Sequence, residues 1–463
     1  MTMSHSDTIC AISSASGQGA IAIIRLSGMD ALGICEMVFK PKKKDLVLSE
    51  QQGGTLHYGT ISDHDQIIDD VLVGIFKAPH SYSGEDIIEI SCHGSVYIQQ
   101  RILKLLLQHG ARLAGPGEFT LRAFINGKMD LSQAEAVSDL INSQTETSHR
   151  MAIDQMRGGF SHKLKELRQK LLNFTSLIEL ELDFSEEDVE FADRTEFKKL
   201  LDEIEKEITR LRSSFELGNA IKNGIPITIA GNPNVGKSTL LNTILNEEKA
   251  IVSDIAGTTR DSIEDVLNIK GIAFRFIDTA GIRETTDAIE SIGINRTFEK
   301  MKQARIILFL VDAGEKTEII QKQIQSVNPE KHQKLFVLLN KSDKLNKEEL
   351  KKIIDSLKSW NVVPICAKDP AIVEEFLIQL HDSVEKEINE YDNTLVSTMR
   401  HAEALEQTLN SLQHVKNGLE EQISTDLLAI DIRGALHFLG EITGEINTDE
   451  ILGNIFRNFC IGK

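Results

Sequence analysis

The chain has 463 residues, about two to four times the usual size of one domain, so more than one domain is expected. Its 51 Lys and Arg residues are outnumbered by 70 Asp and Glu residues, and the net charge of −19 disfavours non-specific binding to nucleic acid. Any RNA contact must therefore be local or made through a partner. The five cysteines form no Cys-x-x-Cys pair, and no stretch has the composition of a secretion signal or a membrane span, which favours a reduced, cytoplasmic protein without a membrane segment.

Residues 1–117 are expected to form an α+β domain. Short β-rich runs, among them Ala20–Leu26, Val71–Phe76 and Ile87–Ser91, alternate with glycine turns and a helical segment near Val96–His109.

Residues 118–219 contain no proline and place apolar residues three and four apart, which predicts long amphipathic helices.

Residues 220–382 change character again, because β-branched runs such as IPITIAG, RIILFLVDAG and KLFVLLNKSD alternate with helical segments. This alternation is typical of a mostly parallel sheet with crossover helices. Residues 383–463 return to helical periodicity. The fold class is therefore multidomain α/β, and the two helical blocks form either one helical domain interrupted by the α/β segment or two separate helical modules.

The segment Gly231–Ser238 fits the P-loop pattern G-x-x-x-x-G-K-[ST], and it lies between the strand Ile225–Ala230 and a helical run. Glycines let backbone amides turn toward phosphate oxygens, and the helix N-terminus adds a partial positive charge. Lys237 can reach the β and γ phosphates, and Ser238 can ligate Mg²⁺. The other loop residues expected at the nucleotide are Asn234, Val235, Gly236 and Thr239.

Two further segments are expected to respond to the γ-phosphate. Asp278–Gly281 follows the strand AFRFI, so that the Asp278 carboxylate can hold the water shell of the metal and Gly281 can donate its amide. Upstream, a switch segment carries the threonine that completes Mg²⁺ coordination, with Thr259 preferred over Thr258. The remaining residues expected to bind the nucleotide here are Ser253, Asp254, Ile255, Ala256, Gly257, Thr279 and Ala280.

The motif Asn340-Lys341-Ser342-Asp343 ends the strand KLFVLLN and decides for guanine. A carboxylate at Asp343 can accept two hydrogen bonds from guanine N1–H and the 2-amino group, which adenine does not supply. Cys366-Ala367-Lys368 resembles the Ser-Ala-Lys turn that contacts the base, with a weaker S–H donor in place of the serine hydroxyl.

The position after the D-x-x-G motif, where Ras-type enzymes orient water with glutamine, holds Ile282, so catalytic help must come from elsewhere. The charged candidates in the following segment are Arg283, Glu284, Asp287 and Glu290, and their spacing alone does not choose among them.

With these motifs, the N-terminal stretches IAIIRLSG, SYSGEDIIEISCHG and GPGEFTLRAFINGKMDLSQAEAVSDLI, and the terminal sequence FCIGK, the chain resembles the MnmE (TrmE) family over essentially its whole length. The resemblance implies a folate-binding, dimerising N-terminal domain, a helical domain, and a G domain inserted into the latter. It also implies a homodimer that forms a heterotetramer with the FAD-containing partner MnmG (GidA) and adds an aminomethyl-type group to C5 of the wobble uridine in certain tRNAs.

The resemblance further implies residue roles. Two G domains would meet across their nucleotides and be activated by K⁺, whose ligands would be Asn234, Ser253, the carbonyl of Ile255, and Thr258. Glu290 would act on the attacking water through a second water. The one-carbon donor would be 5-formyltetrahydrofolate or a related tetrahydrofolate, held by Arg25, Glu85, Lys128 and Lys463, with Cys460 beside it as a nucleophile or ligand. Without the resemblance, these cations would be interpreted as surface charges and Cys460 as an idle thiol.

Two other functions compete with this reading. A pure switch GTPase of the Era type would need an RNA-binding module with a basic surface, and the acidic helical tail offers none. A transport GTPase of the FeoB type would need transmembrane helices after the G domain, and the sequence contains no apolar span.

Overall fold

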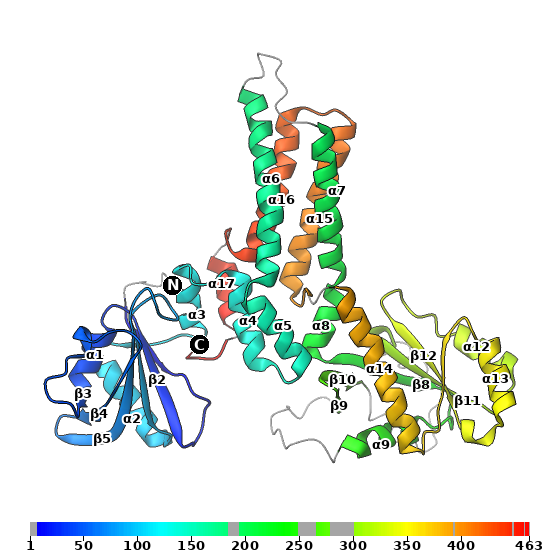
Figure 1. Cartoon of the computed structure of the whole chain (residues 1–463), viewed down its shortest axis with the longest axis horizontal. Coiled ribbons are helices and arrows are strands. Elements are labelled where there is room, and N and C mark those ends of the chain that lie inside the picture. The colour runs from blue at the N-terminus through cyan, green and yellow to red at the C-terminus, as the bar shows by residue number, and fades with distance from the viewer. Residues whose placement is uncertain are drawn as a thin grey trace. The chain divides into compact units, whose positions relative to one another are not determined.

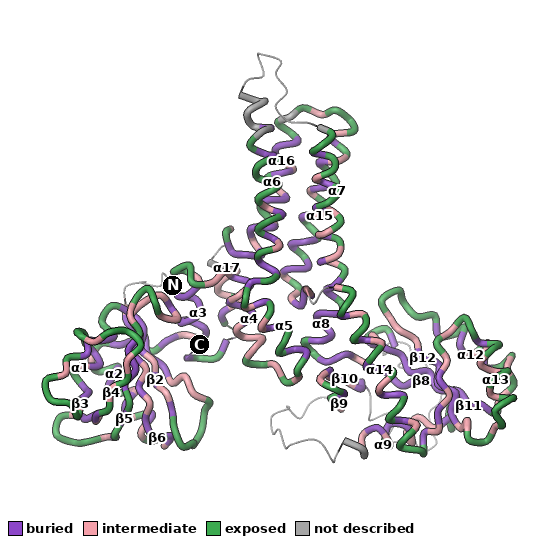
Figure 2. Tube along the Cα trace, in the orientation of Figure 1, coloured by how far each residue is buried: buried purple, intermediate pink, exposed green. Residues whose placement is uncertain are grey.

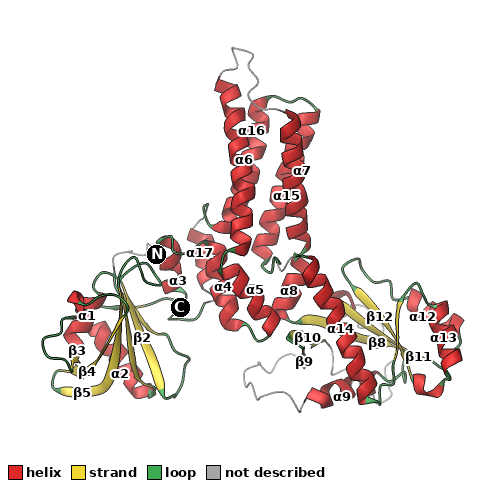
Figure 3. Ribbon diagram, viewed as in Figure 1, coloured by secondary structure: helices red, strands yellow, loops and turns green. Residues whose placement is uncertain are grey.

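The structure is a computed structural model that describes residues 7–183, 194–248, 265–277, 301–391, 394–446, 449–457 and 459–462. Contacts between its residues divide the chain into two compact units. The first comprises the described residues of Met1–Ser138, Gln155–Gln169 and Leu436–Lys463, and the second those of Asp139–Asp154 and Lys170–Ala435. Each unit combines a β-sheet with helices (Figure 3).

The first unit contains a seven-stranded sheet in the order β3-β4-β5-β6-β2-β1-β7. All neighbouring strands are antiparallel except β1 and β7. The strands are β1 (Ile9–Ile12), β2 (Ile21–Ser27), β3 (Phe39–Pro41), β4 (Thr55–Asp63), β5 (Gln66–Phe76), β6 (Ile87–His93) and β7 (Arg112–Leu113). The helices within this part are α1 (Ala31–Val38), the 3₁₀ turn η1 (Leu48–Glu50), α2 (Val96–Gln108) and α3 (Glu118–Ile125).

The two faces of this sheet are covered by different helices. On one face, α1 and α2 bury an apolar core with strand residues such as Ile24 and Ile90 (Figures 1 and 2). On the other face, Phe119 of α3 packs against Ile9 and Ala11, the β1 residues that alternate with the buried Cys10. Because Arg25 pairs with Ala11 in the β1–β2 register, its side chain belongs to the face under α3.

Helices extend the first unit and lead into the second. The helices α4 (Leu131–Asn142), α5 (Glu146–Met156), α6 (Gly159–Asp183) and α16 (Thr425–Thr443) contribute to both units, and α17 (Asp449–Phe456) lies in the first. In the described parts of the chain, no helix combines the length and apolar character needed to cross a bilayer.

In the second unit, α7 (Arg194–Ser213), before the α/β segment, packs along α15 (Met399–Glu420), after it. The buried residues of α7 are spaced three and four apart, which gives the helix one apolar stripe: Phe197, Leu201, Ile204, Ile208 and Leu211. At the rim, Lys416 pairs with Asp202 at 2.6 Å and also with Glu205, and Arg212 pairs with Glu406 at 2.9 Å. The helical blocks on either side of the α/β segment therefore contact each other, while the predicted domain boundaries stay predictions.

The α/β segment of the second unit forms a six-stranded sheet in the order β13-β12-β11-β8-β10-β9. Only the hairpin of β9 and β10 is antiparallel. The strands are β8 (Ile225–Gly231), β9 (Asp265–Ile269), β10 (Ile272–Phe276), β11 (Ile306–Asp312), β12 (Lys334–Asn340) and β13 (Asn361–Pro364). The helices are α8 (Phe215–Asn223), α9 (Lys237–Glu248), α12 (Thr317–Gln325), η3 (Ser342–Lys344), α13 (Lys347–Ser356) and α14 (Pro370–Glu390).

Both faces of this sheet are buried, as a parallel sheet requires. Along β11, Ile306, Leu308 and Leu310 join a core with α9 and α14, whereas Ile307, Phe309 and Val311 join a second core with α12 and α13. The continuous apolar run of β11 is thus explained by helices on both sides. The predicted α+β domain, helical blocks and mostly parallel P-loop sheet are confirmed as a fold class.

One predicted helix is divided. The sequence Glu196–Ile221 has unbroken helical periodicity, but the structure separates α7 from α8 at Ser214. The Ser214 hydroxyl donates to the Leu211 carbonyl at 2.7 Å and accepts from the Val396 amide at 3.0 Å. One residue, a buried serine whose hydroxyl bonds a distant backbone amide, thus separates α7 from α8, and periodicity carries no sign of this interruption.

We expect the α6–α7 contact to contribute strongly to the stability of the second unit. The rings of Phe174 and Phe197 stack with centroids 3.7 Å apart, and Phe197 is fully buried. Substitution Phe197→Ala should lower the free energy of unfolding by about 3–5 kcal/mol, because it leaves a cavity. Chemical denaturation followed by circular dichroism measures this change. The control Leu172→Ala, at an exposed position of α6, should stay within about 0.5 kcal/mol of the wild type, and equal effects of the two substitutions would contradict the expectation.

Candidate functional site

The P-loop of the second unit has the geometry of a phosphate site. It runs from the end of β8 into α9, so that Ser238 and Thr239 lie in the first helical turn. Gly231 and Gly236 have φ of +143° and +105°, and an added Cβ would collide with Leu310 O and Asn340 Nδ2 respectively. The backbone of this loop therefore requires glycine at both positions.

Lys237 bends back over the loop. Its Nζ donates to the carbonyls of Gly231 at 2.8 Å and Asn232 at 2.9 Å. Burial lowers the pKa of this ammonium group. The cation is thus held at the mouth of the loop, where phosphate oxygens would approach the backbone amides.

Asn340 connects the P-loop to the loop of residues 366–368, which is predicted to contact the base. Its side chain is buried, with Nδ2 donating to Val235 O at 2.6 Å and Oδ1 accepting from Ala367 N at 2.9 Å. Thr243 of α9 adds a hydrogen bond to Ala367 O at 2.7 Å. The carboxamide of Asn340 therefore joins its own motif to the P-loop at Val235 and to the following loop at Ala367. Its observed role is to hold these two loops together.

The residues predicted to read guanine lie at the same edge of the sheet. Lys341 has a φ of +62°, and its Nζ donates to Asn234 O at 3.1 Å and to Asp312 Oδ2 at 2.7 Å. Burial works against ionisation of Asp312, but the hydrogen bonds from Lys341 and the Gly314 amide and the charges of Lys341 and Lys344 together outweigh it and lower the pKa of this carboxyl. Asp343 and Lys368 are exposed beside this link, and Cys366 is half-buried.

Asp312 was not singled out in the sequence. It ends β11 directly opposite Asn340 in the β11–β12 register. A carboxylate at the end of an apolar strand, next to the lysine of the guanine motif, is the signal that could have identified it.

Several predicted site residues lie outside the described residues. They are Ser253, Asp254, Ile255, Ala256, Gly257, Thr258, Thr259, Asp278, Thr279, Ala280, Gly281 and Glu290 at the nucleotide, and Lys463 at the tail. Their roles stay predictions.

A second polar site lies in the first unit, between β2, α3 and the loop before β6. Arg25 donates to Glu89 Oε1 from Nε at 2.9 Å and Nη2 at 2.7 Å. Its guanidinium carbon lies 5.4 Å from the centre of the Tyr82 ring and 5.6 Å from that of Phe119. Arg25 is therefore a largely buried, stacked cation rather than a free surface charge.

Glu85 and Lys128 are brought together by the loop between β5 and β6. An added Cβ at Gly84 would lie 3.3 Å from Lys128 Cγ, and Lys128 Nζ donates to Pro79 O at 2.8 Å. Ser27, two residues after Arg25 on the same face of β2, donates to Glu85 Oε2 at 2.6 Å. Three of the four residues predicted at this site thus come from elements that contact one another.

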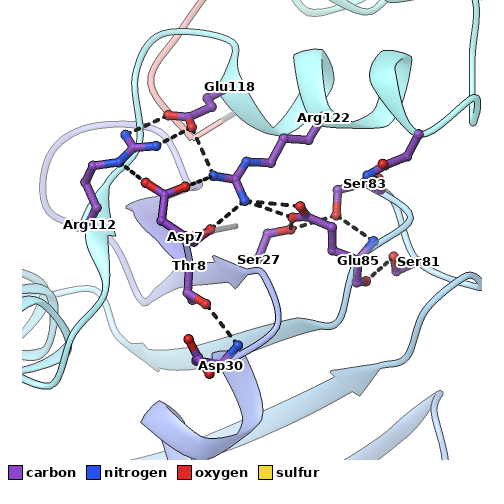
Figure 4. Close-up of polar contacts among 11 residues, drawn as sticks. Asp7, Thr8, Ser27, Asp30, Ser81, Ser83, Glu85, Arg112, Glu118 and Arg122 are labelled. Carbon is purple, nitrogen blue, oxygen red and sulfur yellow. Dashed lines mark hydrogen bonds and ion pairs between the residues drawn. The ribbon is translucent and has the colours of Figure 1, made fainter. Parts of the chain in front are cut away.

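An ion cluster behind Glu85 was missed in the sequence (Figure 4). Arg122 of α3 and Arg112 of β7 share the carboxylates of Asp7 and Glu118, and Arg122 also reaches Glu85. Burial disfavours ionisation of Glu118, but hydrogen bonds from Arg112 and the Gly115 amide outweigh it and lower its pKa. Arginine and glutamate four apart on the buried face of α3 were the available signal.

The C-terminal tail is docked against this same unit. Cys460 O accepts from the Gly117 amide at 3.3 Å, Ile461 bridges to Pro116, and Gly462 O accepts from Ser13 Oγ at 3.0 Å. The Cys460 side chain is exposed. The tail therefore lies beside the start of α3, where it contacts Gly117, two residues before Phe119 in the sequence.

Comparison with known proteins decides the family. The chain is 54% identical over 468 residues to the tRNA modification GTPase MnmE of Flavobacterium johnsoniae, with 100% of both chains covered. It is 52% identical over 465 residues to the tRNA modification GTPase MnmE of Bacteroides thetaiotaomicron, with 99% of this chain and 100% of the relative covered. The chain belongs to the MnmE family.

Two family descriptions agree with this membership. Residues 131–460 match the MnmE helical domain, and residues 8–128 match the GTP-binding protein TrmE N-terminus. A solved GTP-binding protein of Sulfolobus solfataricus in complex with GDP shares 17% identity over 48% of this chain and 67% of that chain, with a TM-score of 0.27, which is too low to add to the assignment. The predictions of a GTPase and of an MnmE family member are confirmed, and the family implies binding of GTP and Mg²⁺.

For the MnmE nucleotide site, we expect Asn340→Ala to weaken guanine-nucleotide binding. The substitution leaves Val235 O and Ala367 N without their hydrogen-bond partner, at a cost of about 1–3 kcal/mol for each buried group. GDP affinity measured by calorimetry should fall about tenfold or more.

The matched control is Asn346→Ala, which removes the capping box of α13 and leaves the loops of the nucleotide site unchanged. GDP affinity should stay at the wild-type value in this control. Equal GDP affinity in both variants would show that the Asn340 link does not organise the site.

Proposed function

We propose that this protein uses GTP hydrolysis to drive modification of the wobble uridine of certain tRNAs, at C5 and with an aminomethyl-type group. It would act as a homodimer in the cytoplasm, in a heterotetramer with MnmG, and would contact tRNA through that complex. The observation that carries the proposal is the docked tail, because residues 460–462 lie beside α3 together with the polar site around Glu85. A GTPase that acted only as a switch would have no need of this second site.

At the nucleotide, the described residues fit a phosphate and its metal. Lys237 presents its ammonium group at the mouth of the loop, and Ser238 stands in the first turn of α9, where its hydroxyl would ligate Mg²⁺. A bound Mg²⁺ would neutralise phosphate charge. Asp343 would select guanine through its exposed carboxylate, and backbone groups of residues 366–368 would support the base.

The activating ion in this proposal is K⁺. Asn234 is exposed on the P-loop, so its carboxamide oxygen is accessible to an ion shared with a second G domain. Ser253, Ile255 and Thr258 would supply the other ligands, Thr259 would complete the Mg²⁺ site, and Glu290 would orient water. A monovalent cation there would stabilise the negative charge that develops on the phosphates in the transition state, as an arginine finger does.

The K⁺ proposal predicts a salt-specific rate. GTP hydrolysis by the full chain should be faster in KCl than in NaCl at equal ionic strength, and Asn234→Ala should lose that difference because an oxygen ligand is removed. We expect the loss to be about tenfold or more, which is less than the roughly 100-fold to 1,000-fold cost of removing one oxyanion-hole donor. Equal rates of the wild type in both salts would contradict the K⁺ mechanism and favour a pure switch.

The folate proposal rests on the polar site of the first unit. A tetrahydrofolate has a ring system with N–H donors and a glutamyl tail with carboxylates. Glu85 offers an acceptor, and Arg25, the exposed Lys128 and the terminal Lys463 offer cations. Cys460 is exposed next to α3 and would act beside the ligand.

The homodimer is supported by an apolar patch on the first sheet. Leu56, Tyr58, Leu72 and Phe76 lie on one face of β4 and β5 and are 37–71% exposed. Gly74 lies among them, where an added Cβ would be 3.3 Å from Leu56 Cδ2. Contiguous exposed apolar groups of this kind mark protein contacts, and a second copy of this chain would cover them.

The docked tail predicts the effect of Gly462→Ala. Gly462 has a φ of +98°, and an added Cβ would lie far inside van der Waals contact with Ile12 O. The clash should displace the tail and weaken 5-formyltetrahydrofolate binding about tenfold or more, since 1.4 kcal/mol of strain corresponds to tenfold. Wobble-uridine modification in the presence of MnmG should fall accordingly, while GTP hydrolysis is retained.

The control for this variant is Gly453→Ala in α17, where an added Cβ meets no atom within 4 Å. It should bind 5-formyltetrahydrofolate as the wild type does. If Gly462→Ala also bound it normally, the tail would have no part in the site.

A further inference from the structure

Arg122 contacts three carboxylates with one guanidinium. Nη1 donates to Glu85 Oε1 at 3.1 Å and Oε2 at 3.2 Å, and also to the Asp7 carbonyl at 2.8 Å. Nη2 donates to Asp7 Oδ1 at 2.7 Å and to Glu118 Oε1 at 3.2 Å. The Arg122 side chain is only 7% exposed. A buried cation with this many directed contacts has one position available to it.

Glu85 is held from a second side as well. Ser27 Oγ donates to Oε2 at 2.6 Å, and the fully buried Ser83 hydroxyl lies 2.7 Å from Ser27 Oγ and accepts from the Glu85 amide at 3.2 Å. The Glu85 side chain is nevertheless 18% exposed. Since a carboxylate has about four acceptor positions, the three contacts from Arg122 and Ser27 orient the Glu85 carboxylate and leave about one position for a ligand donor.

The second arginine of the cluster, Arg112, pairs with Asp7 and Glu118. Arg112 donates to Asp7 Oδ2 at 2.6 Å and Glu118 Oε1 at 2.6 Å. Its hydrogen bond is the main cause that lowers the pKa of Asp7. The two guanidinium groups thus pair with the carboxylates of Asp7, Glu85 and Glu118. Loss of Arg122 would leave the Glu85 carboxylate near two other negative charges without its own cation.

We propose that Arg122 is a positioning residue, which acts through Glu85 to fix the carboxylate that receives an N–H donor of a tetrahydrofolate ring. This inference rests on the folate site proposed above. A carboxylate accepts a directed hydrogen bond from a ligand only when its remaining lone pair points at the donor, so the orientation of its plane matters. Arg122 Nη1 spans both oxygens and sets that plane, and Ser27 prevents rotation about the terminal torsion, which is otherwise broad.

The test is a double-mutant cycle on the full chain, with 5-formyltetrahydrofolate as the probe and calorimetry as the measurement. Arg122→Gln should weaken binding about 10-fold to 100-fold in the wild-type background. In the Glu85→Gln background, the same substitution should change affinity by less than about twofold, because the carboxylate through which Arg122 acts has already been removed. Arg122→Lys keeps the charge without the fork, so it should restore only part of the affinity.

The matched control is Arg112→Gln, which removes the same charge from the same cluster at a residue that bonds Asp7, Glu118 and Leu113 O. It should bind the probe within about threefold of the wild type. If Arg122→Gln does not fold, Ser27→Ala takes its place, with an expected weakening of about threefold to tenfold that is likewise absent in the Glu85→Gln background.

Additive effects of Arg122→Gln and Glu85→Gln, or equal weakening by Arg112→Gln, would overturn the inference and give Arg122 a purely structural role. Wild-type affinity in Arg122→Gln would overturn it as well. If the wild-type chain itself failed to bind 5-formyltetrahydrofolate, the folate proposal would fail first, and the two failures are therefore distinguishable.

Discussion

The register of the parallel strands is the constraint on which the nucleotide site depends. Gly231 pairs with Leu310, and Asp312 pairs with Asn340, so the ends of β8, β11 and β12 lie at one edge of the sheet. A shift by one residue would turn every one of these side chains to the opposite face. The buried carboxamide of Asn340 then closes this edge by joining two loops that the register has already brought together.

The two sites use different physics. The P-loop relies on backbone amides and on glycines in conformations closed to other residues, with a single lysine above them. The site in the first unit relies on side chains, and its polar groups bond one another in a network of charges. The first kind of site leaves a motif in the sequence, because spacing along one loop determines it. The second assembles from distant segments, and no short pattern records it.

This difference explains how far the sequence could predict the molecule. The strand ends, the P-loop and the guanine motif follow from local pattern and were placed correctly in the fold. The role of Asn340 as a link, the partners of Arg122 and the break at Ser214 all depend on long-range contacts: Arg122 meets Glu85 and Asp7 from 37 and 115 positions away. Periodicity even argues against two of these features, since it favours an unbroken helix through Ser214 and an apolar residue at the buried position of Arg122.

The hydrogen bond between Ser214 and the Val396 amide joins residues 182 positions apart, at the points where the chain enters and leaves the α/β segment. Close packing reinforces it, because an added Cβ at Gly218 would collide with Val396 O. The entropy cost of closing a loop depends on the flexible chain between its two ends, and residues that are already folded add little to that cost. For the helices α7 and α15, the whole inserted segment is therefore equivalent to a short turn. A domain whose two ends already lie together can be inserted between two paired helices at little entropic cost.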